Sequence, residues 1–107
     1  MKKLSVATEF SEFPAGRVPD DGPNSGERFR EEKLLPLLNG SGDRIEINLD
    51  ETMGYGSSFL EEAFAGLLRN NGKTERELRD RLVFVDSRII YELMIWDYIA
   101  EEQARAR

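Results

Sequence analysis

The chain has 107 residues, 39% of them apolar and 34% charged, so it predicts a single soluble globular domain spanning residues 1–107. The net charge of −6 argues against direct binding to nucleic acid or to an anionic membrane, because both need a basic surface. With neither cysteine nor histidine, disulfides, thiolate sites and catalysis by histidine are excluded. No apolar run has the length of a signal peptide or a membrane span, so we expect a cytoplasmic protein.

The first third of the chain predicts two strands and a loop. Apolar and polar residues alternate over residues 3–10, which is typical of a strand with one buried face. Residues 13–18 predict a turn that leads into a short second strand. Residues 19–24 are dense in turn formers and predict a surface loop.

A helix is predicted from Asn24 or Ser25, because Asn24 and Glu27 have the spacing of a capping box. Pro36 lacks a backbone donor, so it should kink the helix or end it near Leu35.

The central segment predicts a strand, a loop and a helix. Residues 44–49 alternate as a strand does, and Gly54 and Gly56 give the loop after it a tight path. From Ser58 onward the apolar residues form the one-sided stripe of an amphipathic helix, which Gly72 closes in a left-handed conformation. Ser58 and Glu61 again have capping-box spacing.

The last third predicts a short helix over residues 74–81, capped by Thr74, and a strand over residues 82–85 that is buried on both faces. A final helix is predicted from a Ser87 cap to about Ala104. Its apolar arc over residues 89–99 is wider than one core face requires. Either the helix is nearly engulfed, or the Ile89–Ile99 segment is the interface of a homodimer.

Strands that alternate with helices predict an α/β fold with right-handed crossovers. We expect a mostly parallel or mixed sheet of about four strands, with about four helices.

The candidate functional residues lie between the central strand and its helix: Asp50, Gly56, Ser57, Ser58, Glu61 and Glu62. One interpretation is that Ser58 only caps the helix. The other is that Ser58 is a regulatory hydroxyl, because a phosphate there would meet free backbone amides and the positive end of the helix dipole. Glu61 and Glu62 would repel that phosphate, so modification would weaken the binding of a partner.

A catalytic role is not expected for these residues. Asp50 and Glu51 are a pair of carboxylates that could bind Mg²⁺, but the chain has no glycine-rich phosphate loop with a lysine. Nothing places a nucleophile beside a base. We therefore predict neither an enzyme nor a bound metal or cofactor.

Three stretches, residues 21–30, 45–50 and 56–67, resemble the small bacterial STAS-like domains of unknown function, and the resemblance extends over about residues 13–100. More distantly, the chain is similar to the STAS domain of anti-sigma-factor antagonists, which carries an Asp-Ser-Ser-Gly turn at the start of a helix. Gly56 and Phe59 stand where that family has the aspartate and the glycine. The resemblance implies a STAS fold, Ser58 as the phosphoacceptor beside Ser57, and an ATP-binding kinase of the anti-sigma type as the partner.

A second hypothesis is a small acidic inhibitor that imitates nucleic acid, as phage anti-CRISPR proteins do. It is motivated by the net charge of −6 and by carboxylate pairs at residues 31–32, 50–51, 61–62 and 101–102. Its partner would be a basic nucleic-acid-binding protein.

Overall fold

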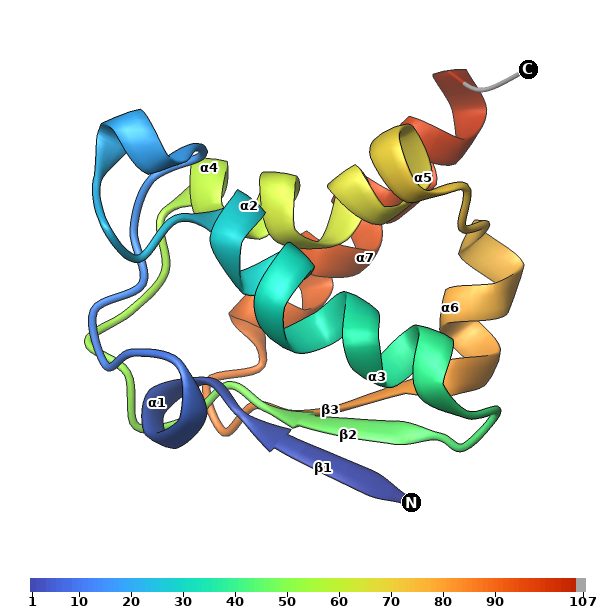
Figure 1. Cartoon of the computed structure of the whole chain (residues 1–107), viewed down its shortest axis with the longest axis horizontal. Coiled ribbons are helices and arrows are strands. Elements are labelled where there is room, and N and C mark those ends of the chain that lie inside the picture. The colour runs from blue at the N-terminus through green and yellow to red at the C-terminus, as the bar shows by residue number, and fades with distance from the viewer. Residues whose placement is uncertain (106–107) are drawn as a thin grey trace.

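A three-stranded parallel sheet forms one layer of the computed structural model, which describes residues 1–105. The strands are β1 (Lys2–Ser5), β2 (Ile45–Asn48) and β3 (Leu82–Val85), in the spatial order β1-β2-β3. The larger helices cover one face of the sheet (Figure 1). The predicted α/β class and the parallel sheet are confirmed, with one strand fewer than expected.

Two helical crossovers connect the strands. The first is a continuous helix made of α2 (Gly26–Phe29), a π-helical turn (Arg30–Leu34) and α3 (Leu35–Gly40). The second is made of α4 (Ser57–Leu60), a π-helical turn (Glu61–Ala65) and α5 (Gly66–Asn71), followed by the separate helix α6 (Glu75–Arg81). The chain ends with α7 (Ile90–Arg105), and two short elements, α1 (Val6–Glu9) and a 3₁₀ turn (Pro19–Asp21), follow β1.

The core lies between the central strand and the helical layer. Ile45 and Ile47 of β2 are completely buried, and so are Phe59 and Phe64 of the second crossover. Their alternation with half-buried Glu46 and Asn48 shows that one face of β2 packs on the helices while the other is partly open.

The predicted strand over residues 3–10 is wrong beyond Ser5, where helix α1 begins. The Ser5 hydroxyl accepts a hydrogen bond from the Thr8 amide at 3.3 Å, and the Ser5 amide donates to the Glu9 carboxylate at 2.8 Å. This reciprocal capping favours a helical turn over continued extension. The second predicted strand, over residues 13–18, is also wrong, because this segment has no regular structure.

The first crossover helix is capped by Ser25, whose hydroxyl accepts from the Arg28 amide at 3.2 Å. The alternative cap, Asn24, is wrong, because its side chain instead donates to the Phe13 carbonyl at 3.4 Å. Pro36 does not end the helix, which continues to Gly40. The π-helical turn before Pro36 places it at the start of α3, where a missing amide is tolerated.

Two caps of the second crossover are confirmed. Gly72 ends α5 with a φ of 71°, which is the left-handed conformation that glycine adopts without strain. The Thr74 hydroxyl accepts from the Glu77 amide at 3.1 Å and so caps α6.

Two expectations for the last third are wrong. β3 is an edge strand that is not buried on both faces, and Val85 at its end is 37% exposed. Ser87 does not cap α7, which begins at Ile90; the Asp86 carboxylate instead accepts from the Glu92 amide at 3.0 Å.

We expect Gly26→Ala to lower the free energy of unfolding by about 1–3 kcal/mol, because an added methyl group at this close helix contact overpacks the core. A Cβ atom at Gly26 would lie 2.5 Å from the Phe59 carbonyl oxygen. Gly40→Ala is the matched control, since no atom lies within 4 Å of the Cβ position at Gly40. Urea unfolding measures both variants, and equal stabilities would contradict the prediction.

Candidate docking site at the carboxyl end of the sheet

The predicted site residues gather around the loop that joins β2 to α4. All three strands are parallel, so their carboxyl ends lie together at one end of the sheet, on the left of Figure 1. From this end the loop rises to the start of α4 in the helical layer. Open α/β sheets place their binding sites at this end.

The start of α4 is an exposed tip formed by Gly56, Ser57 and Ser58, which we call the serine tip. The helix begins at Ser57, and its N-cap residue is Gly56, which has no side chain to cap it. The predicted Ser58 capping box is therefore wrong. In residues 1–105, neither serine hydroxyl takes part in a hydrogen bond, so both are free to meet another molecule.

The loop beneath the serine tip is held rigidly. The Tyr55 hydroxyl donates to the Leu49 carbonyl at 2.9 Å, and the Arg88 guanidinium donates to the same carbonyl at 2.7 Å. Arg88 also stacks 4.7 Å above the Tyr91 ring, whose centroid lies 5.0 Å from that of Tyr55. Burial raises the pKa of Tyr55 to about 12, so it remains a neutral donor.

Asp50 takes part in this bracing. Its carboxylate accepts hydrogen bonds from the Ser87 amide at 2.8 Å and from the Ser87 hydroxyl at 3.0 Å. It therefore joins the loop after β2 to the turn after β3. Glu51, weighed as its partner in Mg²⁺ binding, has a φ of 72° and an exposed side chain.

Two large apolar side chains are exposed on loops at the same end of the sheet. Met53 is 79% exposed and Phe13 is 64% exposed. The Met53 amide donates to the Glu12 carbonyl at 2.8 Å, which holds the two loops together. Exposed apolar side chains next to polar ones are typical of surfaces that bind other proteins.

Glu61 and Glu62, one turn beyond the tip, belong to a cluster of ion pairs with Arg17, Arg30 and Arg69. Glu62 is 6% exposed and binds the buried Arg30 at 2.6 Å. Arg69 binds Glu61 at 3.0 Å and Glu62 at 3.2 Å, while Arg17 contacts both carboxylates. Sequence analysis missed this cluster, because Arg17 and Arg30 are 32 to 45 residues from the glutamates and no local spacing connects them.

The cluster keeps both carboxyl groups ionised. Burial raises the pKa of Glu61, but hydrogen bonds from Arg69 and Arg17 outweigh it, so this pKa lies below its ordinary value. For Glu62, hydrogen bonds from Arg30 and Arg17 likewise outweigh burial and lower the pKa. The positive charges of the arginines thus neutralise the two glutamates that were expected to repel a phosphate on Ser58.

The six predicted residues thus have three different settings. Gly56, Ser57 and Ser58 lie together on the surface, and Asp50 links the loop after β2 to the turn after β3. Glu61 and Glu62 belong to the ion-pair cluster.

Most of the acidic pairs behind the inhibitor hypothesis also contact arginines: Glu31 binds Arg30, Glu32 binds Arg28, and Glu102 binds Arg69. That hypothesis stays a prediction.

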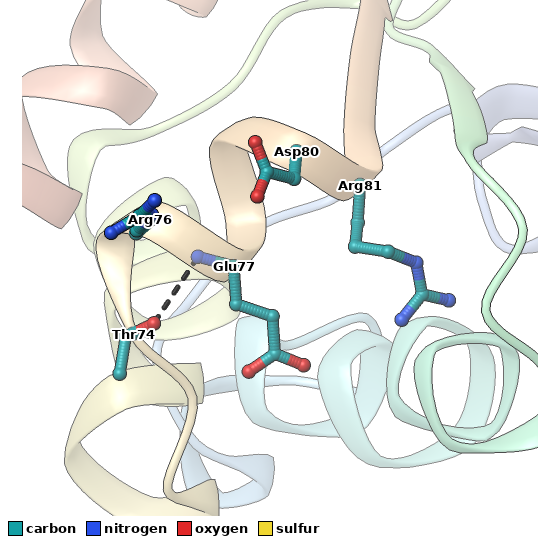
Figure 2. A pocket seen from close by; sticks show the side chains of 5 residues that line it. All are labelled: Thr74, Arg76, Glu77, Asp80 and Arg81. Carbon is teal, nitrogen blue, oxygen red and sulfur yellow. Dashed lines mark hydrogen bonds between the residues drawn. The ribbon is translucent and has the colours of Figure 1, made fainter.

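An open depression of about 340 Å³ lies along α6 (Figure 2). Helix α6 and the start of α4 lie on opposite sides of the molecule (Figure 1). It is lined by Thr74, Arg76, Glu77, Asp80 and Arg81. Arg81 donates to the Ser41 carbonyl at 2.6 Å and the Asp43 carbonyl at 2.8 Å, so its role is to hold the loop before β2.

Over residues 1–105, no group of three or more acidic side chains is arranged to hold a metal ion. Across the same residues, no helix is long and apolar enough to cross a membrane.

In a comparison with protein families, a family described as a STAS-like domain of unknown function (DUF4325) matches residues 25–88. The matched region begins at the Ser25 cap and contains the serine tip, β2 and β3. Neither the curated proteins nor the solved structures include a match to the chain.

We predict that the ion-pair cluster makes stability fall in acid. In the folded protein, the pKa values of Glu61 and Glu62 lie below the ordinary value of 4.5. Both carboxylates therefore stabilise the fold when the pH is above 4.5. Their contribution is lost as the pH falls through the lowered values. Urea unfolding between pH 7 and pH 3 should therefore show a steeper loss of stability below about pH 4.5 in the parent chain than in Glu61→Gln. The exposed Glu12→Gln variant is the control, and equal slopes for Glu61→Gln and the parent would refute the prediction.

Glu62→Gln should lower the free energy of unfolding by about 3 kcal/mol, because it removes the carboxylate 2.6 Å from the buried Arg30 guanidinium and leaves only the half-exposed Glu31 carboxylate at 3.2 Å. Glu101→Gln is the matched control, since the Glu101 side chain is 63% exposed and should matter by less than about 0.5 kcal/mol. Chemical unfolding at pH 7 measures both. A loss for Glu62→Gln as small as that for Glu101→Gln would show that the pair does not stabilise the fold.

Proposed function

Because the chain belongs to the family of STAS-like domains of unknown function, we propose that it is a non-enzymatic protein-binding module that docks through the serine tip. The observation that carries the proposal is that Gly56, Ser57 and Ser58 are exposed at the start of a 15-residue helical segment, with both hydroxyls free. Docking residues on a rigid base bind more tightly, because little conformational entropy is lost on binding. Arg88, Tyr55 and the Asp50–Ser87 link provide that base.

The partner surface extends from the tip to the two exposed apolar side chains, Met53 and Phe13. Apolar anchors supply most of the binding energy in protein interfaces, whereas the hydroxyls at the tip would supply direction and specificity. The net charge of −6 favours a partner with a basic surface.

We further propose Ser58 as a regulatory phosphoacceptor, with an ATP-binding kinase of the anti-sigma type as the partner. The Ser58 hydroxyl would take the γ-phosphate of ATP, releasing ADP. The backbone amides at the helix start favour the new negative charge. Glu61 does not oppose it strongly, since that carboxylate already contacts Arg17 and Arg69.

The Ser58 proposal predicts that Ser58→Glu and Ser58→Ala bind the partner with different affinities, because only the former carries the charge of a phosphate. We would capture partners from the native host, identify them by mass spectrometry, and titrate each purified partner with the parent and both variants by calorimetry. Ser41→Glu is the matched control, since Ser41 is exposed at the opposite end of the sheet.

The expected result is a change of about tenfold or more in Kd for Ser58→Glu, with Ser58→Ala and Ser41→Glu close to the parent. Equal affinities of Ser58→Glu and Ser58→Ala for the partner would show that phosphorylation of Ser58 does not regulate binding. If a Ser57→Arg, Ser58→Arg double variant binds the partner with the same Kd as the parent, the serine tip is not the docking site.

A further inference from the structure

Charge is unevenly distributed along the strands of the sheet. Each strand begins with a basic residue or directly follows one: Lys2 for β1, Arg44 for β2 and Arg81 for β3. The segments that follow the strands, residues 6–25, 49–56 and 86–89, lie together toward the left of Figure 1, and we call them the acidic end. Their seven carboxylates are those of Glu9, Glu12, Asp20, Asp21, Asp50, Glu51 and Asp86.

The acidic end holds most of the net charge of the chain. Its seven carboxylates are accompanied by only two arginines, Arg17 and Arg88, so this end has a net charge of −5. The rest of the chain has 14 acidic and 13 basic residues and is almost neutral. The net charge of −6 therefore belongs to one end of the molecule, which is also the end that carries the proposed docking site.

Nearby arginines do not neutralise the exposed carboxylates of the acidic end. Arg17 binds the two glutamates of the ion-pair cluster, and Arg88 donates to backbone carbonyls of the loop after β2. Arg28, which reaches this end from α2, pairs with a glutamate one turn along its own helix. Glu12 and Glu51 are exposed and form no ion pair with a cation of residues 1–105. Their charge is therefore available to another molecule.

Glu12 and Glu51 flank the two exposed apolar side chains of the docking site. Phe13 directly follows Glu12, and Met53 lies two residues after Glu51. The hydrogen bond from the Met53 amide to the Glu12 carbonyl, at 2.8 Å, keeps the two loops side by side. Apolar side chains flanked by carboxylates are complementary to a surface on which cations surround an apolar centre.

We propose that the acidic end binds a protein segment that combines apolar side chains with lysine or arginine. This inference rests on the proposed docking function and names the class of partner. The apolar side chains of the segment would cover Phe13 and Met53, while its cations would meet Glu12 and Glu51. Because the basic residues lie at the other end of the strands, the field of the chain would orient such a partner toward the docking site before contact.

A short helical peptide of leucine and lysine is the probe that tests the proposal, and the same peptide with glutamate in place of lysine is its counterpart. Each is titrated into the full chain while the backbone amide signals are followed by nuclear magnetic resonance. The lysine peptide is expected to shift the signals of residues 12–13 and 51–53, and the glutamate peptide is expected to leave them unchanged.

Charge reversal then locates the binding. A Glu12→Lys, Glu51→Lys double variant should raise the Kd of the lysine peptide about tenfold or more. The matched control is Asp43→Lys with Glu101→Lys, which changes the net charge by the same amount at two exposed residues outside the acidic end. It should raise the Kd far less, because charges more than about 10 Å apart are largely screened at 0.1 M salt. Circular dichroism establishes that each variant is folded.

Two results would overturn the proposal: a lysine peptide that leaves the signals of the acidic end unchanged, or equal Kd values for the two charge-reversed variants. The test is separable from that of the serine tip. If a captured partner is lost by the Ser57→Arg, Ser58→Arg variant but binds the Glu12→Lys, Glu51→Lys variant with the parent Kd, the docking function stands and the cationic partner is rejected. The opposite pattern would support the cationic partner and confine docking to the loops around Phe13 and Met53.

Discussion

The buried pair between Arg30 and Glu62 sets how the two crossover helices meet. Arg30 is 3% exposed, and its guanidinium donates both to the Glu62 carboxylate and to the Glu62 backbone carbonyl, each at 2.6 Å. Removing a charge from water is costly, and such a pair is tolerated only when additional hydrogen bonds are made. The second hydrogen bond, to the Glu62 backbone carbonyl, fixes the position of one crossover helix along the axis of the other. Gly66 permits this arrangement, because a side chain there would collide with the guanidinium.

The position of the serine tip follows from this contact. Glu62 lies in the helical segment that begins at Ser57, so a helix fixed at Glu62 holds its first turn at a defined place. Arg17 joins the cluster from the long loop after β1, and the Asp21 carboxylate accepts from the Arg17 amide at 3.0 Å. Three segments that are distant in sequence thus meet at this cluster: the loop after β1, the first crossover helix and the second crossover helix. The exposed residues of the tip contribute little to this framework, which leaves them free for recognition.

Sequence patterns were sufficient where the determining contacts are local. β2, the amphipathic helix after it and the caps at Gly72 and Thr74 all depend on neighbours within a few residues, and all were predicted. Residues 3–10 were predicted as a strand because Leu4 and Val6 follow the alternation of a strand. The structure forms a helical turn after Ser5 instead, because the Ser5 and Glu9 side chains cap it. Ser58 was misjudged because a capping box fixes a helix start only to within a residue, and Glu61 instead binds two arginines. The ion-pair cluster could not be predicted, since nothing local relates Arg17 or Arg30 to residues 61–62.

The base of the serine tip depends on two neighbouring strands. The tip lies past the carboxyl end of β2, at the end of the sheet where the turn after β3 also lies. The Asp50–Ser87 link connects the loop under the tip to that turn, so the base of the docking site includes both β2 and β3.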